Sequence, residues 1–193
     1  MILSDTNIRA RCDPMIVGKE GGLIWPYDPK ALQPASVDLT LDKHFLKPGL
    51  ARGQIIDLAD VAGTVGPTTY TEITATELYG IVLPPHQFIL GSTAETVNIP
   101  SDLVASIEGK SSLARLGLFV HVTAGFIDPG FRGKVTLELF NANERWIRLR
   151  PGLHICQIAF TSLSSPAARP YGSKGLSSHY QDQTEVTSSR YEG

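Results

Sequence analysis

Short apolar runs separated by turn signals constrain the fold of this chain more than any other feature. Pro84-Pro85, Asp128 to Gly130 and Pro151-Gly152 each stand between two such runs, and Pro and Gly at these positions favour turns. Many short strands with frequent turns are typical of an all-β barrel or sandwich. We therefore expect strands at 36–41, 54–57, 80–83, 87–91, 104–107, 118–122, 134–140, 146–150 and 153–160.

The composition agrees with one folded domain spanning residues 1–193. Of the 193 residues, 42% are hydrophobic, which is enough for a core. We expect a short helix from Ser4 or Asp5 to about Arg11 and irregular structure over 13–35. The net charge of -2 gives no basic field for nucleic acid. No apolar run approaches membrane-spanning length, and the N-terminus lacks a secretion signal. These features predict a cytoplasmic protein that binds neither nucleic acid nor membrane.

The cysteines and histidines indicate neither a disulfide framework nor a zinc site. The two cysteines, Cys12 and Cys156, lie far apart in the sequence and not in a CxxC pair, so a reduced cytosolic setting is the simpler interpretation. The five histidines do not cluster. The H-x-E and P-C-x-x-C signature of zinc-dependent deaminases is absent, and we expect no zinc.

Lys110, Ser111 and Ser112 precede a short stretch, 113–116, that has room for one helical turn. Ser is a favoured N-cap, and exposed N–H groups at a helix start attract anions. Arg115 adds a planar fork suited to phosphate or carboxylate. The segment predicts either a local anion site or a capped turn with two surface cations.

Asp128 to Gly130 forms a strong turn signal, and it follows the small residues Ala124 and Gly125. Small residues allow a ligand to approach the backbone closely. Two interpretations of Asp128 stay open, because its carboxylate can cap its own turn or accept a hydrogen bond from a sugar hydroxyl.

The segment 134–141, KVTLELFN, alternates with period two and predicts a strand with one face on the core. Glu138 then shares the opposite face with Thr136 and Phe140. We expect it in a partly apolar recess, which suits general acid and base work; the alternative is a solvated carboxylate on an exposed face. The core-facing residues are Val135, Leu137 and Leu139.

From Ser164 onward, large apolar residues become rare. Such a segment buries little area, so we expect 164–193 to be a mobile C-terminal tail. It is either a disordered end or a lid that closes over a ligand, excludes water and brings in Tyr171 and Gln183.

Seven motifs follow one another along nearly the whole chain: QPASVDLTL at 33–41, ETVNIPSDLVASIEG at 95–109, GKSSLARLGL at 109–118, HVTAGFIDPGF at 121–131, TLELFN at 136–141, ARPYGSKG at 168–175 and HYQDQ at 179–183. In order and spacing they resemble the dCTP deaminases of the trimeric dUTPase superfamily. The resemblance implies a dUTPase-like distorted jelly-roll barrel (β-clip) with short helices. It also implies a homotrimer with active sites between subunits.

The resemblance further implies deamination of dCTP without zinc. Glu138 would act as general base and then general acid for a water that attacks C4 of cytosine. Ser111, Arg115 and the carbonyl of Ala124 would hold that water, and Asp128 would lie under the deoxyribose. Magnesium would be bound through the triphosphate, and dTTP is a feedback inhibitor in many members. The other implied substrate contacts are Lys110, Ser112, Leu113, Ala114, Thr136, Leu137, Gln157, Tyr171, His179 and Gln183.

Gly125-Phe126 bears on the product. Enzymes that stop at dUTP carry a bulky His-Arg pair there, whereas the small Gly125, together with Gln157, resembles the bifunctional type that releases dUMP and pyrophosphate. His179 stands where relatives carry Lys, so its phosphate contact would be weaker or pH-dependent.

Three alternatives stay open: a monofunctional deaminase releasing dUTP, a plain dUTPase, and a catalytically silent nucleotide-binding regulator. The joint presence of Glu138 and Arg115 argues against the plain dUTPase, because hydrolysis of dUTP needs no carboxylate at C4. The intact set of Ser111, Arg115 and Glu138 argues against the silent regulator.

Overall fold

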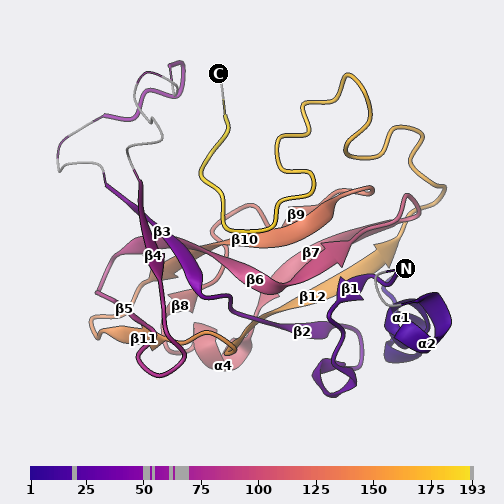
Figure 1. Cartoon of the computed structure of the whole chain (residues 1–193), viewed down its shortest axis with the longest axis horizontal. Coiled ribbons are helices and arrows are strands. Elements are labelled where there is room, and N and C mark those ends of the chain that lie inside the picture. Colours follow the sequence, from indigo (N-terminus) through magenta and orange to yellow (C-terminus); the bar gives the residue numbers. More distant parts are fainter. Residues whose placement is uncertain (19–20, 50–52, 54, 61–62, 64–69, 192–193) are drawn as a thin grey trace.

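The computed structural model describes residues 1–18, 21–49, 53, 55–60, 63 and 70–191 (Figure 1). The helices are short: α1 (Asp5–Cys12), α2 (Pro14–Val17), the 3-10 helix η1 (Pro29–Ala31) and α4 (Ser111–Ala114). The expected N-terminal helix is confirmed. The prediction of irregular structure over 13–35 holds for most of that segment, although α2, η1 and a two-residue strand lie within it.

Within the described residues the strands form three antiparallel sheets. The first contains β4 (Tyr70–Thr74), β3 (His44–Pro48), β6 (Phe88–Asn98), β10 (Arg132–Asn141) and β8 (Leu118–Phe119) in that order, with β1 (Ile24–Trp25) also paired to β6. The second contains β2 (Val37–Thr40), β12 (His154–Ser162), β7 (Leu103–Gly109) and β9 (Phe126–Ile127). The third pairs β11 (Ile147–Leu149) with β5 (Ile81–Leu83).

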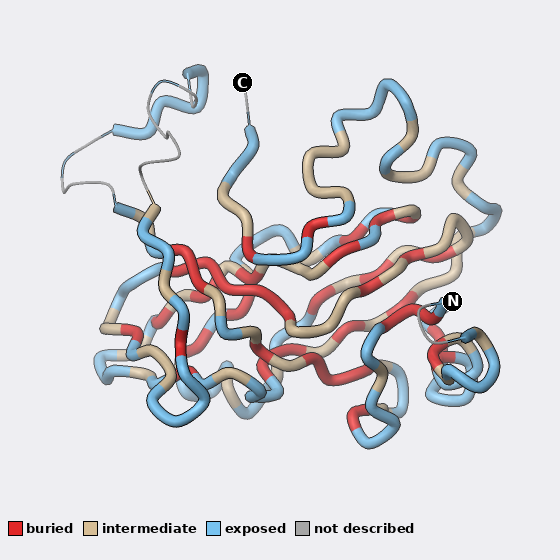
Figure 2. The backbone as a smooth tube through the Cα atoms, viewed as in Figure 1, coloured by how far each residue is buried: buried red, intermediate tan, exposed pale blue. Residues whose placement is uncertain are grey.

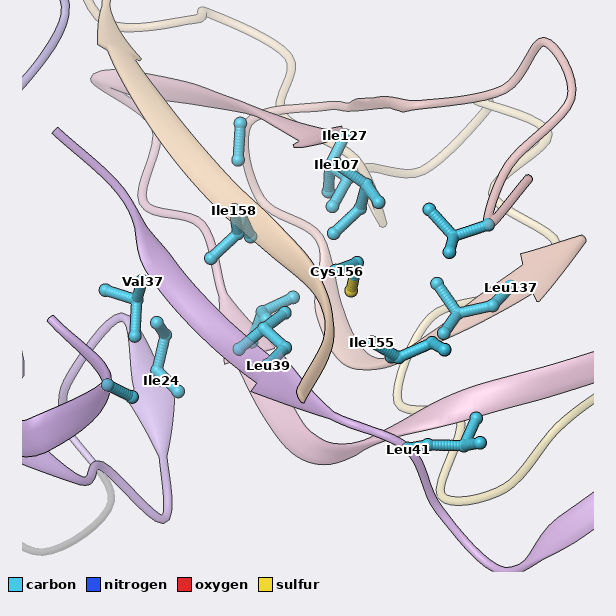
Figure 3. Close-up of a cluster of buried hydrophobic side chains, with 14 of the residues drawn as sticks. Ile24, Val37, Leu39, Leu41, Ile107, Ile127, Leu137, Ile155, Cys156 and Ile158 are labelled. Atoms are coloured by element: carbon cyan, nitrogen blue, oxygen red, sulfur yellow. The ribbon is translucent and has the colours of Figure 1, made fainter. Parts of the chain in front are cut away.

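The core consists of apolar side chains from all of these sheets. Figure 2 shows the buried segments running along the strands, and Figure 3 shows Leu39, Leu137 and Ile158 among the side chains of this cluster. Leu137 and Leu139 are fully buried, as the alternation predicted, while Val135 is half-buried against the core. Removal of this apolar surface from water is the main force that holds the sheets together.

The all-β prediction is confirmed, and most of the predicted strands are present. The run at 54–57 is an exception: Ile55 to Asp57 form no strand, and Gln54 lies outside the described residues. Sequence patterns missed β3 and β4. β4 is an edge strand with polar residues, and β3 ends in Pro48, so neither carries the apolar alternation of a half-buried strand. Among the described residues, no helix is long and apolar enough to span a membrane.

Candidate functional site

A cavity of about 480 Å³ brings together side chains from β6, β10, the loop around β9 and the C-terminal segment. Seven of the residues singled out from sequence line it: Ala124, Phe126, Asp128, Thr136, Glu138, Tyr171 and Gln183. The rest of the lining comprises Tyr70, Phe88, Leu90, Ile127, Phe131, Val135, Tyr180 and Thr187 to Ser189.

A register shift in the pairing of β10 with β6 sets the direction of β10, the strand that lines the cavity. Between Lys134 and Thr136 the pairing skips two residues of β6, because Lys134 faces Thr96 and Thr136 faces Ser92. The fully buried Thr93 fills this irregularity: its hydroxyl accepts the N–H of Val135 at 3.0 Å and donates to a β6 carbonyl at 2.8 Å. Such irregularities re-aim neighbouring side chains.

Glu138 lies in the recess that its position predicted. It is half-buried, it lines the cavity, and the residue paired with it on the neighbouring strand β6 is Leu90. One carboxylate oxygen accepts the backbone N–H of Val122 at 2.9 Å, which orients the group. Its second oxygen has no hydrogen-bond partner in the described part of the chain. Such an oxygen is available to a bound water or ligand.

Asp128 does not cap its own turn. Its carboxylate has no hydrogen bond among the described residues, and the turn is closed instead by the N–H of Phe131 on the carbonyl of Asp128 at 3.2 Å. The exposed Asp128 side chain therefore faces the cavity with its acceptors free.

Gly125 packs tightly against β7. Its carbonyl accepts the N–H of Ile107 at 2.7 Å. A Cβ at this position would lie 2.9 Å from the carbonyl oxygen of Ile107 and 3.1 Å from Cε1 of His121. The position therefore has no room for a bulky side chain, and Phe126 beside it is exposed at the cavity wall.

The C-terminal segment packs onto β10. Gln183, with 9% of its surface exposed, donates to the carbonyl of Lys134 and to the hydroxyl of Thr136, the latter at 3.2 Å. Backbone hydrogen bonds from Asp182 to Arg132 (2.7 Å) and from Lys134 to Gln183 (2.9 Å) continue the sheet. Figure 1 shows this segment running over β10.

Three further contacts hold the C-terminal segment. The N–H of Tyr180 donates to the hydroxyl of Tyr171 at 2.9 Å, and Tyr171 meets Phe131 edge-on with 5.7 Å between ring centroids. Val186 is buried against Leu46 and Leu90. The low apolar content of the segment did not predict the Val186 contact, because this contact depends on a single small apolar residue.

The loop that begins at Lys110 lies apart from the cavity. Of the described residues that line the cavity, none belongs to 110–115. Ser111, Ser112, Ala114 and Arg115 are exposed, and Leu113 is half-buried on the core. The expected Ser cap is wrong: Lys110 is the N-cap of α4, without a side-chain cap hydrogen bond.

Lys110 itself is not a free cation. Its ammonium donates to the buried carboxylate of Asp38 on β2. Gln157 lies on β12 opposite Asp38 and accepts the hydroxyl of Ser36 at 3.0 Å, also away from the cavity. These residues form a second polar region around the start of α4.

Two other predicted contacts have particular surroundings. Leu137 is fully buried and does not line the cavity. His179 is half-buried beside Tyr180, with 6.2 Å between ring centroids, and does not line the cavity.

Sequence reasoning missed the apolar wall of the cavity. Phe88 and Leu90 stand on β6 opposite Phe140 and Glu138, and this pairing gives no local signal. Tyr180 lies inside the HYQDQ motif, and Ile127 and Phe131 lie inside HVTAGFIDPGF, so the motifs could have indicated these three missed residues.

The cysteines stand outside the site. Both are buried and free, and burial raises the pKa of the Cys12 thiol to about 11. In the part of the chain that the structure describes, no three His, Cys, Asp or Glu side chains gather as a metal site would require.

Comparisons with known proteins point in one direction. The family profile for dCTP deaminase-like proteins matches residues 2–163. The chain is 46% identical to a Beutenbergia cavernae protein named dCTP deaminase, dUMP-forming, over 98% of this chain and 94% of that one. A Tropheryma whipplei protein of the same name is 45% identical over 98% and 92%.

A solved structure has the same fold. The crystal structure of 2'-deoxycytidine 5'-triphosphate deaminase from Agrobacterium tumefaciens matches with a TM-score of 0.62 and 25% identity, over 84% of this chain. The present chain spans about half the length of that protein (48%).

Proposed function

Because the chain belongs to the dCTP deaminase-like family, we propose that it converts dCTP and two waters to dUMP, pyrophosphate and ammonia. The observation that carries this proposal is the half-buried carboxylate of Glu138, held by the N–H of Val122 at 2.9 Å with one oxygen free in the cavity. Such a group is placed to take and return protons.

In the deamination step, Glu138 takes a proton from a water, and the water oxygen bonds to C4 of cytosine. The electron pair of the C4=N3 bond moves to N3, which takes that proton from the carboxylic acid. Glu138 then carries the remaining hydroxyl proton to the amino group, and the C4–N bond breaks to release ammonia and leave the C4 carbonyl. The carbonyl of Ala124 at the cavity wall is available to accept the second hydrogen of the water.

In the second step, another water attacks the α-phosphorus, and the bond to the β-phosphate bridge oxygen breaks. The free carboxylate of Asp128 is available to orient that water. The magnesium ion enters with the triphosphate as part of the substrate. Asp128 and Glu138 are the two carboxylates among the described lining residues.

The separation of the two polar regions supports a site shared between copies of the chain. The cavity holds Glu138 but lacks the loop with Ser111 and Arg115, whose side chains are exposed. We infer a homotrimer in which the loop of one copy completes the cavity of the next, since cyclic assemblies repeat one heterologous contact. In this assembly dTTP would compete with dCTP for the same cavity.

The product assay tests the activity. Purified protein with magnesium and dCTP is expected to release ammonia, dUMP and pyrophosphate in equal amounts. Accumulation of dUTP without pyrophosphate would identify the monofunctional deaminase. Hydrolysis of dUTP without ammonia release from dCTP would identify a dUTPase, and binding without turnover a regulator.

Glu138→Gln tests the residue. Deamination should fall by about 10²–10⁴-fold, because the proton acceptor is lost, while dCTP binding remains. Glu144→Gln is the control, since this carboxylate is exposed and pairs with His86 at 3.3 Å. Equal activity of the two variants would refute the role of Glu138.

Mixing two inactive variants tests the shared site. Arg115→Ala lacks the loop cation and Glu138→Gln lacks the base. If the loop and the carboxylate of one site come from different copies, random mixed trimers regain about a quarter of the activity. If both groups come from one copy, mixing restores none. Sedimentation as a 20.9 kDa monomer would contradict the assembly directly.

A further inference from the structure

Asp38 is a buried carboxylate that the proposed chemistry does not use. It lies on β2 with 7% of its surface exposed. One oxygen accepts the ammonium of Lys110 and, at 3.4 Å, the amide of Gln33. The other oxygen is buried and has no partner among the described residues.

This arrangement is not expected to stabilise the fold. Burying two charges costs desolvation that their attraction offsets only when the remaining lone pairs are also satisfied. An unpaired buried oxygen adds a further desolvation penalty. A buried polar group that is left unsatisfied calls for an explanation other than stability.

What Asp38 holds is the start of the loop. Lys110 is the N-cap of α4, and its carbonyl accepts the N–H groups of Leu113 and Ala114, each at 2.9 Å. β2 and β7 both pair with β12, so the Lys110 side chain joins the end of β7 to a strand two places away in the sheet. By contrast, the side chains of Ser111 and Arg115 make no hydrogen bond within the described residues.

We propose that Asp38 is a positioning residue for deamination: through Lys110 it fixes α4 and thereby the place at which Ser111 and Arg115 meet the substrate. The inference rests on the proposed function and refines it in one respect. The Lys110 ammonium acts as an anchor held by Asp38 instead of as a ligand of the triphosphate.

The two roles of Lys110 predict different kinetics. If Lys110 is an anchor, it acts through its contact with Asp38. Asp38→Asn and Lys110→Gln then each lower kcat for dCTP at least tenfold, with little change in KM. The double variant is then no worse than either single variant, because two changes that break the same contact are not additive. As a phosphate ligand, Lys110→Gln raises KM, and Asp38→Asn does not reproduce that effect.

Asp42→Asn is the matched control. Asp42 and Lys134 form a similar buried pair, 2.5 Å from Oδ2 to Nζ, and Asp42 does not line the cavity. It is expected to keep kcat within threefold of the unchanged protein. The double variant Asp38→Asn with Lys110→Gln leaves no unpaired charge, so it serves if Asp38→Asn alone does not fold.

The outcomes separate the two levels of inference. If the unchanged protein releases no ammonia from dCTP, the proposed function fails. If it is active and the folded Asp38→Asn protein, or the double variant, keeps an unchanged kcat, only the role of Asp38 fails. Multiplicative losses in the double variant, or an equal loss in Asp42→Asn, also overturn it.

Discussion

Replacing Val186 by Ala tests how the C-terminal segment is held over the cavity. Val186 is 9% exposed and packs in a small cluster with Leu46, Leu90 and Tyr70, separate from the main core. Gln183, three residues earlier, reaches Thr136 inside the cavity. Val186 is thus an apolar contact close to Gln183 that holds this part of the segment against the sheet.

The magnitude follows from the buried area. Val186→Ala removes two methyl groups, each worth about 0.8 kcal/mol when buried, so closure weakens by about 1.6 kcal/mol. A change of about 1.4 kcal/mol is tenfold in an equilibrium, and the open fraction of the segment should rise by roughly that factor. The free energy of global unfolding should change little, because the cluster is small and peripheral.

Amide hydrogen exchange measures this opening. The N–H groups of Asp182, Tyr180 and Arg190 are bonded to Arg132, Tyr171 and Tyr180, and their exchange should accelerate about tenfold. Val82→Ala, on an exposed valine of β5, is the control. KM for dCTP should rise in Val186→Ala alone. Unchanged exchange in Val186→Ala, or equal acceleration in the control, would refute the reasoning.

Three further changes have defined outcomes. Thr93→Val leaves the N–H of Val135 without its acceptor and should lower the free energy of unfolding, measured in urea, by about 1–3 kcal/mol, whereas Thr93→Ser should not. Burial alone would raise the pKa of Asp42, but the hydrogen bond from Lys134 holds the pKa below its ordinary value. The pair therefore stabilises the fold above about pH 4 and loses this effect as pH falls through the lowered pKa. The difference in free energy of unfolding between the unchanged protein and Asp42→Asn should accordingly disappear in acid. Gly125→Ala places a Cβ 2.9 Å from a β7 carbonyl oxygen and should slow pyrophosphate release from dCTP.

Sequence patterns predicted the parts of the fold that depend on repeated apolar burial. Leu137 and Leu139 alternate with polar neighbours, and both are fully buried on β10. β4 was missed because an edge strand has only one neighbour and tolerates polar residues on both faces. The alternation of apolar and polar residues predicts a strand that buries one face. It gives little signal for a strand that buries almost no apolar surface.

The convergence of the cavity residues was predictable only through the family motifs. Ala124, Asp128 and Glu138 lie close in the sequence, so their approach needs one turn and one strand. Gln183 joins them from 45 or more positions away, through hydrogen bonds to β10 that no local period encodes. The pairing of Lys110 with Asp38, 72 positions apart, is of the same kind.

Buried polar contacts between strands and loops fix the exact positions of strands and loops, which apolar packing alone does not determine. Burial of apolar area is non-directional, so it selects which face of a strand points inward but not its fine position. Glu95 on β6 accepts both the N–H and the hydroxyl of Thr40 on β2, and burial raises its pKa despite these bonds. Thr93 beside it holds the backbone of β10. Hydrogen bonds of this kind are directional and strong in a low-dielectric interior. The proposed reaction requires Glu138 to meet a water within a fraction of an ångström, so it depends on these directional interior contacts as well as on the apolar core.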